Sequence, residues 1–222
     1  MAHLFYPRLC EGCNKPLLAG EKVLCISCGL ELPETGYSNI DNNETALRFS
    51  GRVPFLHATS LAYFTNDGLL QHLMHGLKYK GRKEIGEYLG GRLAESLQQT
   101  PWAASLDMVI PVPLYKSKKN KRGYNQSMLI AEAVARALHI PATDDLLLRI
   151  RDTETQTKKT RVERVNNMAD AFVIKDRRKL AGKHILLVDD VLTTGATLEA
   201  CALALMKEES IKISIATIGV AI

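Results

Sequence analysis

The chain has 222 residues, of which 46% are hydrophobic and 24% charged, and its formal net charge is +5. This composition is typical of a soluble globular protein, and the length suits one medium domain with a small appendage. No apolar run approaches the roughly 18 residues of a membrane span, and the first residues lack the apolar core of a signal peptide. We therefore expect a cytoplasmic protein without membrane insertion.

The first feature in chain order is a four-cysteine pattern. Two Cys-x-x-Cys pairs, separated by eleven residues, are formed by Cys10, Cys13, Cys25 and Cys28. Four thiolates can surround Zn²⁺ tetrahedrally and leave no open coordination position, so this zinc would be structural. A segment of about 35 residues cannot bury enough apolar surface to fold alone, and a metal supplies the missing stability. Two disulfides or redox-active pairs are the alternatives, which a reducing cytoplasm and the lack of a thioredoxin-like strand disfavour.

Residues 33–54 mix Pro, Gly, Asn, Ser and Thr with few apolar residues, which predicts an irregular connection. We accordingly divide the chain into a zinc-finger module over residues 1–36, a linker over 37–55 and a main domain over 56–222.

Strand and helix patterns alternate through the main domain. Strands are predicted at residues 56–64, 107–113, 146–150, 171–174, 184–188 and 211–222. Helices are predicted at residues 67–77, 82–98, 126–138, 159–168 and 198–208. This alternation predicts an α/β fold with a mostly parallel sheet flanked by helices. Neither a Gly-x-Gly-x-x-Gly nor a Walker A sequence occurs, which disfavours a dinucleotide-binding or ATP-hydrolysing protein.

The most informative pattern begins at the strand from Ile185 to Val188. The carboxylates Asp189 and Asp190 follow it, and then a loop of small residues leads into a helix. The loop residues are Thr193, Thr194, Gly195, Ala196 and Thr197. Ligands of open α/β sheets bind at the carboxyl ends of strands, and such a loop offers free N–H groups to a phosphate. The pattern predicts a sugar-phosphate site, with a plain strand end and helix cap as the alternative.

Positive charge concentrates in the middle of the chain. Residues 116–183 contain 17 Lys or Arg and 8 Asp or Glu, a net charge of +9, which leaves −4 for the rest. This asymmetry suits an anionic partner such as a polyphosphate or a nucleic acid, and a solvated surface is an equal alternative. We expect the loop after Pro113 to hold a second anionic group through Lys119, Lys121 and Arg122.

Two further blocks give weaker signals. Basic and aromatic residues interleave at residues 78–84, a pattern that can neutralise and stack on an anion or a base. A polar stretch with Gln156 follows the strand at 146–150, and Arg161 and Arg164 share a helix face at their spacing of three.

The segment from Asp189 to Thr197 resembles the phosphoribosyl pyrophosphate signature of type I phosphoribosyltransferases. In order, the chain has four cysteines, LysTyrLysGly, ProValPro, ArgGlyTyrAsnGln, ThrGluThrGlnThr, ArgxxArgxxAsn and ValAspAspValLeuThrThrGlyAlaThr. This ordered set resembles the ComF family over almost the whole chain. The resemblance implies a type I phosphoribosyltransferase-like fold with a small N-terminal zinc-binding module. It implies that Asp189 and Asp190 contact the ribose, that the loop from Thr193 to Thr197 wraps the 5′-phosphate, and that Gln156 lies in a loop closing over the substrate.

The resemblance also implies an activity and its partners. The protein would be a phosphoribosyltransferase, hence a glycosyltransferase, that binds phosphoribosyl pyrophosphate with Mg²⁺ and uses an unknown acceptor. ComF proteins are associated with natural transformation, so single-stranded DNA and other DNA-processing or competence proteins are expected partners. The alternative is a non-catalytic DNA-binding competence protein whose phosphoribosyl site is a sensor or a relic. Candidate DNA contacts are Lys118, Lys119, Lys121, Arg161 and Arg164.

Overall fold

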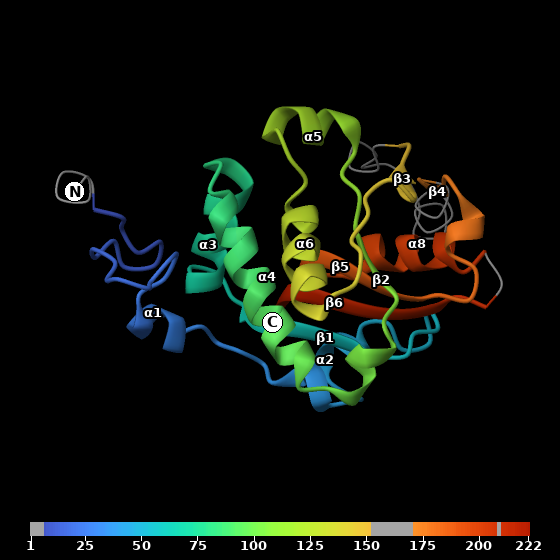
Figure 1. The fold of residues 1–222 in the computed structure, drawn as a ribbon, viewed down its shortest axis with the longest axis horizontal. Coiled ribbons are helices and arrows are strands. Elements are labelled where there is room, and N and C mark those ends of the chain that lie inside the picture. The colour runs from blue at the N-terminus through green and yellow to red at the C-terminus, as the bar shows by residue number, and fades with distance from the viewer. Residues whose placement is uncertain (1–6, 152–170, 208–209) are drawn as a thin grey trace.

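A computed structural model of the chain describes residues 7–151, 171–207 and 210–222. Over these ranges the fold is built on a four-stranded sheet in the order β1–β6–β5–β2 (Figure 1). The strands are β1 (Ala58–Phe64), β2 (Met108–Pro111), β5 (His184–Leu192) and β6 (Lys212–Ala221). All three pairings in this sheet are parallel. A separate antiparallel pair is formed by β3 (Leu147–Arg149) and β4 (Phe172–Ile174).

Helices cover both faces of the sheet, which confirms the predicted α/β class. The α-helices are α1 (Ile26–Leu30), α2 (Glu44–Leu47), α3 (Leu69–Tyr79), α4 (Lys83–Gln98), α5 (Lys116–Arg122), α6 (Gln126–Leu138) and α8 (Ala196–Leu205). Short 3₁₀ helices are η2 (Tyr37–Asn39), η3 (Pro101–Ser105) and η4 (Arg177–Lys179). None of the described helices is both long and apolar enough to cross a membrane.

Alternate residues of β5 enter two separate hydrophobic cores because successive strand side chains point to opposite faces. Leu186 and Val188 pack in the core that contains α3, α4 and α6. Ile185 and Leu187 pack in the core that contains α8 and the β3–β4 pair. All four side chains are fully buried, so β5 reads as a continuous apolar run, as expected of a central parallel strand.

The N-terminal module packs beside α3 and α4 at one end of the molecule, opposite the β3–β4 pair (Figure 1). Its buried residues belong to the same hydrophobic core as those two helices. Ion pairs add to this contact: Glu11 lies 3.3 Å from Arg82, and Glu34 lies 2.7 Å from Arg92.

Three segments differ from the sequence-based expectation. The basic run after Pro113, expected as a loop, forms α5, because Lys and Arg are good helix formers and Gly123 ends the helix with a φ of 80°. β5 continues past Val188 through the acid pair, because β6 goes on pairing with it as far as Leu192. The β3–β4 pair is antiparallel and stands outside the main sheet.

The segment expected as a linker contains η2 and α2. Asn43 caps α2 by accepting a hydrogen bond from the N–H of Ala46. Its side-chain amide donates to the carbonyl of Ala58 at the start of β1, at 2.7 Å. Phe49, just after α2, is fully buried in the α8 core. This segment is therefore packed against the sheet domain.

Candidate functional site

The acid pair lies in the carboxyl-terminal half of β5, between β2 and β6. Asp189 pairs with Thr217 of β6, so the strand is still held in the sheet at this point. Both acids are half-buried. Because Asp189 and Asp190 are neighbours on a strand, their side chains project from opposite faces of the sheet. The pair therefore stands at the carboxyl edge where open parallel sheets bind ligands.

Asp189 accepts two hydrogen bonds at one carboxylate oxygen. The hydroxyl of Ser127, at the start of α6, donates to Oδ1 at 2.9 Å, and the N–H of Asp190 donates to the same atom at 2.8 Å. Burial and the adjacent charge of Asp190 nevertheless raise the pKa of Asp189 to about 7. A carboxyl group with this pKa can donate or accept a hydrogen bond near neutral pH, which suits a sugar hydroxyl.

Asp190 forms an ion pair with a lysine of α3. The Nζ of Lys78, in the last turn of α3, lies 2.8 Å from Asp190 Oδ2. The side chains of both residues are largely buried, with 22% and 14% of their surface exposed. Little solvent separates the two charges, so this ion pair is stronger than a typical surface pair. Lys78 is the first residue of the block at residues 78–84, so this block provides the ion-pair partner of Asp190.

The loop after β5 forms a phosphate-sized hollow. A pocket of about 50 Å³ is lined by Asp189, by Val191 and Leu192, and by every residue from Thr193 to Leu198. Gly195 adopts a φ of 78° immediately before α8 begins, a conformation that favours glycine. The N-terminus of α8 and the loop N–H groups give the hollow a positive potential. All five loop residues predicted to bind the phosphate line this one pocket.

A second pocket, of about 400 Å³, lies between α3 and α5. It is lined by Lys78, Tyr79, Gly81, Lys118, Lys121, Arg122 and Tyr124. The guanidinium of Arg122 lies over the ring of Tyr79, 5.4 Å from its centre. Four cationic side chains around one hollow suit a polyanion. Because Lys78 both lines this basic pocket and pairs with Asp190, the pocket adjoins the acid pair.

Other predicted site residues fall elsewhere. Lys119 is not among the residues that line the basic pocket; its Nζ lies 3.2 Å from the carboxylate of Asp144. The helical turn of α5 accounts for this, because residues 118, 121 and 122 share a helix face that residue 119 leaves. Gln156, Arg161 and Arg164 lie outside the described residues.

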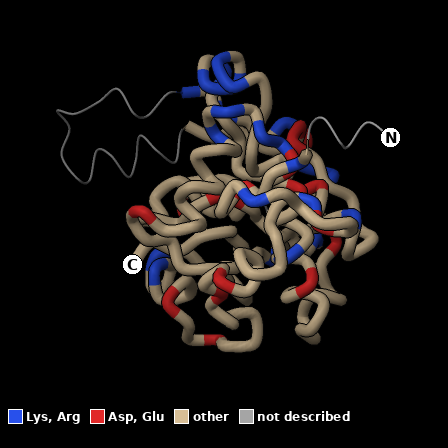
Figure 2. Tube along the Cα trace, turned by 90° about the vertical axis from the view of Figure 1, so that its left-hand side faces the viewer, with Lys and Arg blue, Asp and Glu red and all other residues tan. Residues whose placement is uncertain are grey.

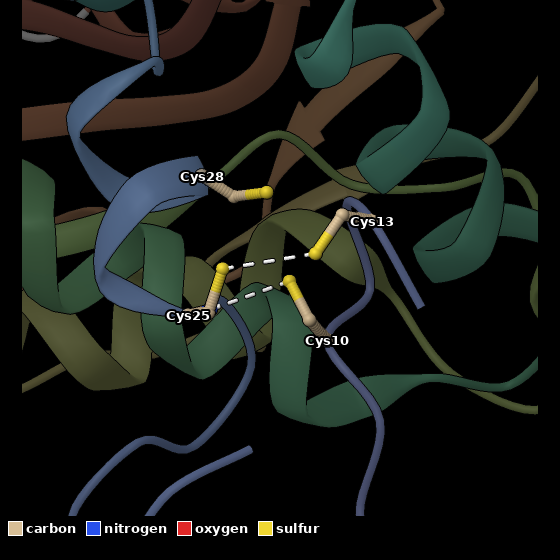
Figure 3. A group of neighbouring side chains, drawn as sticks. All are labelled: Cys10, Cys13, Cys25 and Cys28. Atoms are coloured by element: carbon tan, nitrogen blue, oxygen red, sulfur yellow. Dashed lines mark hydrogen bonds between the residues drawn. The ribbon is translucent and has the colours of Figure 1, made fainter. Parts of the chain in front are cut away.

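The four cysteines of the N-terminal module point toward one another (Figure 3), and their Sγ atoms all lie within 4.8 Å of one another. Zinc bonds of about 2.3 Å place tetrahedral sulfur ligands about 3.8 Å apart, and the Sγ atoms of Cys13 and Cys25 are 3.7 Å apart. Burial raises the pKa of Cys10, but backbone N–H donors outweigh it and lower the pKa to about 6. The cluster could therefore bind a metal such as zinc.

Sequence reasoning missed the residues that support the acid pair and the loop. Ser127 directly follows the ArgGlyTyrAsnGln block, so its position was the available signal. Lys78 begins the LysTyrLysGly block, but nothing in the sequence indicated which group it would face. Arg48 and Arg52 donate to the carbonyls of residues 193 and 194, and no sequence signal marked them.

Comparison with known proteins agrees with this geometry. The phosphoribosyl transferase domain family matches residues 125–221, which include the acid pair and the phosphate-sized pocket. DNA utilization protein YhgH of Escherichia coli (strain K12) is 29% identical, over 92% of this chain and 93% of its own length. Competence protein ComFC of Bacillus subtilis (strain 168) is 25% identical, over 90% of this chain and 79% of its own length.

Competence protein F of Haemophilus influenzae is 35% identical over a shorter stretch, 46% of this chain and 44% of its own length. The predicted resemblance to type I phosphoribosyltransferases and to the ComF family is confirmed. Residues 125–221 thus match the phosphoribosyl transferase domain family, and the chain is similar to the competence proteins F and ComFC and to DNA utilization protein YhgH.

Proposed function

We propose that the protein binds Mg²⁺-phosphoribosyl pyrophosphate at the carboxyl edge of its sheet and transfers the phosphoribosyl group to an acceptor. One observation carries this proposal. The acid pair stands between a phosphate-sized pocket and a basic pocket, and Lys78 belongs to the basic pocket while it contacts Asp190 at 2.8 Å. A phosphorylated sugar with a pyrophosphate leaving group presents phosphate, hydroxyls and polyanion in that same order.

Each part of the edge then has a role. The loop from Thr193 to Thr197 receives the 5′-phosphate through its N–H groups and the N-terminus of α8. Asp189 and Asp190 hold the ribose hydroxyls and offset the positive charge that develops at the anomeric carbon. Lys121 and Arg122 receive the pyrophosphate. Lys78, which also contacts Asp190, would lie next to the bond between ribose and pyrophosphate that breaks. Gln156 remains a proposed contact beyond the described residues.

The acid pair fits a magnesium ion, because carboxylate oxygens are the ligands that Mg²⁺ takes together with substrate phosphates. Bound there, Mg²⁺ would offset the charge of the pyrophosphate. The cysteine cluster fits zinc, and we propose that it is a structural Zn²⁺ site within residues 1–36. Residues 37–55 would connect this module to the phosphoribosyl domain over 56–222.

Room for an acceptor lies on the other side of Lys78. A groove of about 690 Å³ runs along the exposed face of α3 and includes Lys78, His72, His75 and Tyr79. A nucleophile that displaces pyrophosphate approaches the anomeric carbon from the opposite face. The groove supplies two imidazoles, and a ring nitrogen of either could act as general base toward such a nucleophile.

Binding of single-stranded DNA is a second candidate function, favoured by the surface of α5. Five of its seven residues are basic and none is buried. Figure 2 shows Lys and Arg gathered at the top of the molecule, where α5 lies. Tyr79, 65% exposed, offers a stacking surface beside them. The relatives named for competence and DNA utilization give this proposal its context, and other proteins of DNA processing are partners we propose on the same ground.

Pyrophosphate release tests the enzymatic proposal. We expect Mg²⁺-dependent binding of phosphoribosyl pyrophosphate, and release of pyrophosphate with one member of a panel of nucleobases, ammonia donors and single-stranded DNA. Asp190→Asn and Thr194→Val should weaken binding at least tenfold, while Lys207→Ala, exposed beyond the C-terminal end of α8 and absent from the pocket lining, should not change it. Binding that both site variants leave intact would refute the site.

Salt dependence tests the DNA proposal. The affinity for single-stranded DNA should fall steeply with added salt, because bound cations are released when lysines replace them. Lys118→Ala with Lys121→Ala should weaken binding and flatten this dependence, whereas the matched pair Lys207→Ala with Lys212→Ala should do neither. An affinity that ignores both salt and the α5 variant would refute DNA binding through α5.

A further inference from the structure

Two arginines that precede the sheet hold the phosphate loop from behind. The Nη1 of Arg48 donates to the carbonyl oxygen of Thr193 at 3.3 Å, and the Nη1 of Arg52 donates to that of Thr194 at 2.9 Å. These contacts join residues 145 and 142 positions apart in the chain. They come from the segment just after α2, outside the region that matches the phosphoribosyl transferase domain.

The geometry of the peptide bond gives these contacts a consequence. In a trans peptide the C=O of one residue and the N–H of the next point in opposite directions. The arginine that fixes the carbonyl of Thr193 therefore also aims the N–H of Thr194, and the other one aims the N–H of Gly195. Neither N–H donates to any residue within the described ranges. Both residues line the phosphate-sized pocket.

The two arginines are themselves held in place. Arg48 also donates to the carbonyl of Ala221 at 2.9 Å and pairs with Glu44 at 3.2 Å. Arg52 donates to the carbonyl of Arg48 at 2.8 Å and pairs with the carboxylate of Glu199, in the first turn of α8. A guanidinium has five donors in a fixed plane, so each arginine can make several contacts at once.

Between the arginines, Phe49 closes the same contact. Its ring lies 3.1 Å from the place where a Cβ on Gly195 would stand. The pairing of Arg52 with Glu199 has a further effect, because an unpaired carboxylate in the first turn of α8 would repel a phosphate at that helix end. The segment from Arg48 to Arg52 thus fixes the backbone of the loop and neutralises the acid next to it.

We propose that Arg48 and Arg52 are positioning residues for the 5′-phosphate. They hold two loop peptides so that the N–H groups of Thr194 and Gly195 face the phosphate, and they do not contact it themselves. This inference rests on the proposed function for the identity of the anion. The orientation of the two peptides does not depend on that identity, so it can be tested separately.

Calorimetric titration of the full-length protein with two anions separates positioning from general damage. For the double variant Arg48→Met with Arg52→Met we expect ribose 5-phosphate affinity to fall at least tenfold. Affinity for Mg²⁺-pyrophosphate, which the basic pocket would take, should stay within about twofold of wild type. Arg48→Lys with Arg52→Lys should recover part of the loss, because an ammonium group can still donate to a loop carbonyl but lacks the planar fork of the guanidinium. Arg178→Met, at an arginine whose side chain is 94% exposed, is the matched control.

Hydrogen exchange gives a readout that needs no ligand. Amide exchange within residues 191–198 should be faster in the methionine variant than in wild type and in Arg178→Met. Unchanged exchange, or equal losses of ribose 5-phosphate and pyrophosphate affinity, would overturn the inference. If wild type bound no ribose 5-phosphate, the proposed function would fail, and the exchange rates alone would decide whether the arginines hold the loop.

Discussion

Replacing Asp189 by Asn should stabilise the protein in a pH-dependent way. Burial and the charge of Asp190 raise the pKa of Asp189 from 3.8 to about 7. Because the folded chain holds this proton more tightly than the unfolded chain, the contribution of Asp189 to the free energy of unfolding falls as the pH rises from about 4 to above 7. A shift of this size corresponds to roughly 4 kcal/mol when the group is fully ionised.

The measured loss of unfolding free energy should be smaller than this, because solvent at the open edge of the sheet and the charge of Lys78 screen part of the charge of Asp189. The amide oxygen of Asn can keep the two hydrogen bonds that Asp189 accepts from Ser127 and from the next N–H. We therefore expect Asp189→Asn to exceed wild type by about 1 to 3 kcal/mol in the free energy of unfolding at pH 8, and by less than half of that amount at pH 5.

Urea unfolding at several pH values between 5 and 8 measures this difference directly. Asp190→Asn is the matched control, because it removes a carboxylate from the same edge but leaves Lys78 without its partner. It should show no gain at pH 8. A difference between Asp189→Asn and wild type that stays constant from pH 5 to pH 8 would refute the assignment of the buried proton to Asp189.

Three further predictions concern other parts of the chain. Cys25→Ser should abolish the bound zinc measured by elemental analysis, and a full equivalent of zinc in that variant would contradict the four-thiolate site. Lys78→Met should weaken phosphoribosyl pyrophosphate binding about tenfold, because Asp190 loses its partner. The control Lys80→Met, at the exposed C-cap of α3, should bind normally. Equal affinities of the two variants would remove Lys78 from the site. Burial lowers the pKa of His184, whose two ring nitrogens each face a serine hydroxyl. Because the folded chain binds this proton more weakly than the unfolded chain, wild type should lose stability relative to His184→Gln as the pH falls from 7 to 5; parallel pH profiles of thermal unfolding would disprove this.

The parts of the site that follow one another along the chain could be predicted from sequence. The strand, acid pair, loop and helix from Ile185 onward are one continuous pattern, and each residue type is explained by its immediate neighbours. The cysteine pairs are similar, because their spacing alone predicts a cluster of four thiols that could hold a metal ion. Local patterns of this kind need no knowledge of how distant segments pack.

The remaining parts depend on packing between distant segments. The contact of Lys78 with Asp190 exists only because the last turn of α3, the helix after the edge strand β1, reaches β5, two strands away in the sheet, and no local pattern encodes this arrangement. Residues 37–55 have the polar composition of a linker, so Phe49, Arg48 and Arg52 gave no signal of a structural role. The run from Lys116 suggested a loop because of its charge, although Lys and Arg are compatible with a helix.

The residues of the candidate site come from both halves of the chain. Residues 125–221 supply the acid pair and the loop, but Lys78 and the two loop-holding arginines precede them. Without β1, the long strand β6 would have an unpaired edge. Such an edge can pair with strands of other chains and so lead to aggregation. The basic pocket would also lose its α3 side. The proposed phosphoribosyl site therefore draws on the N-terminal half of the chain, and the similarity to YhgH and ComFC likewise extends over nine-tenths of its length and not over residues 125–221 alone.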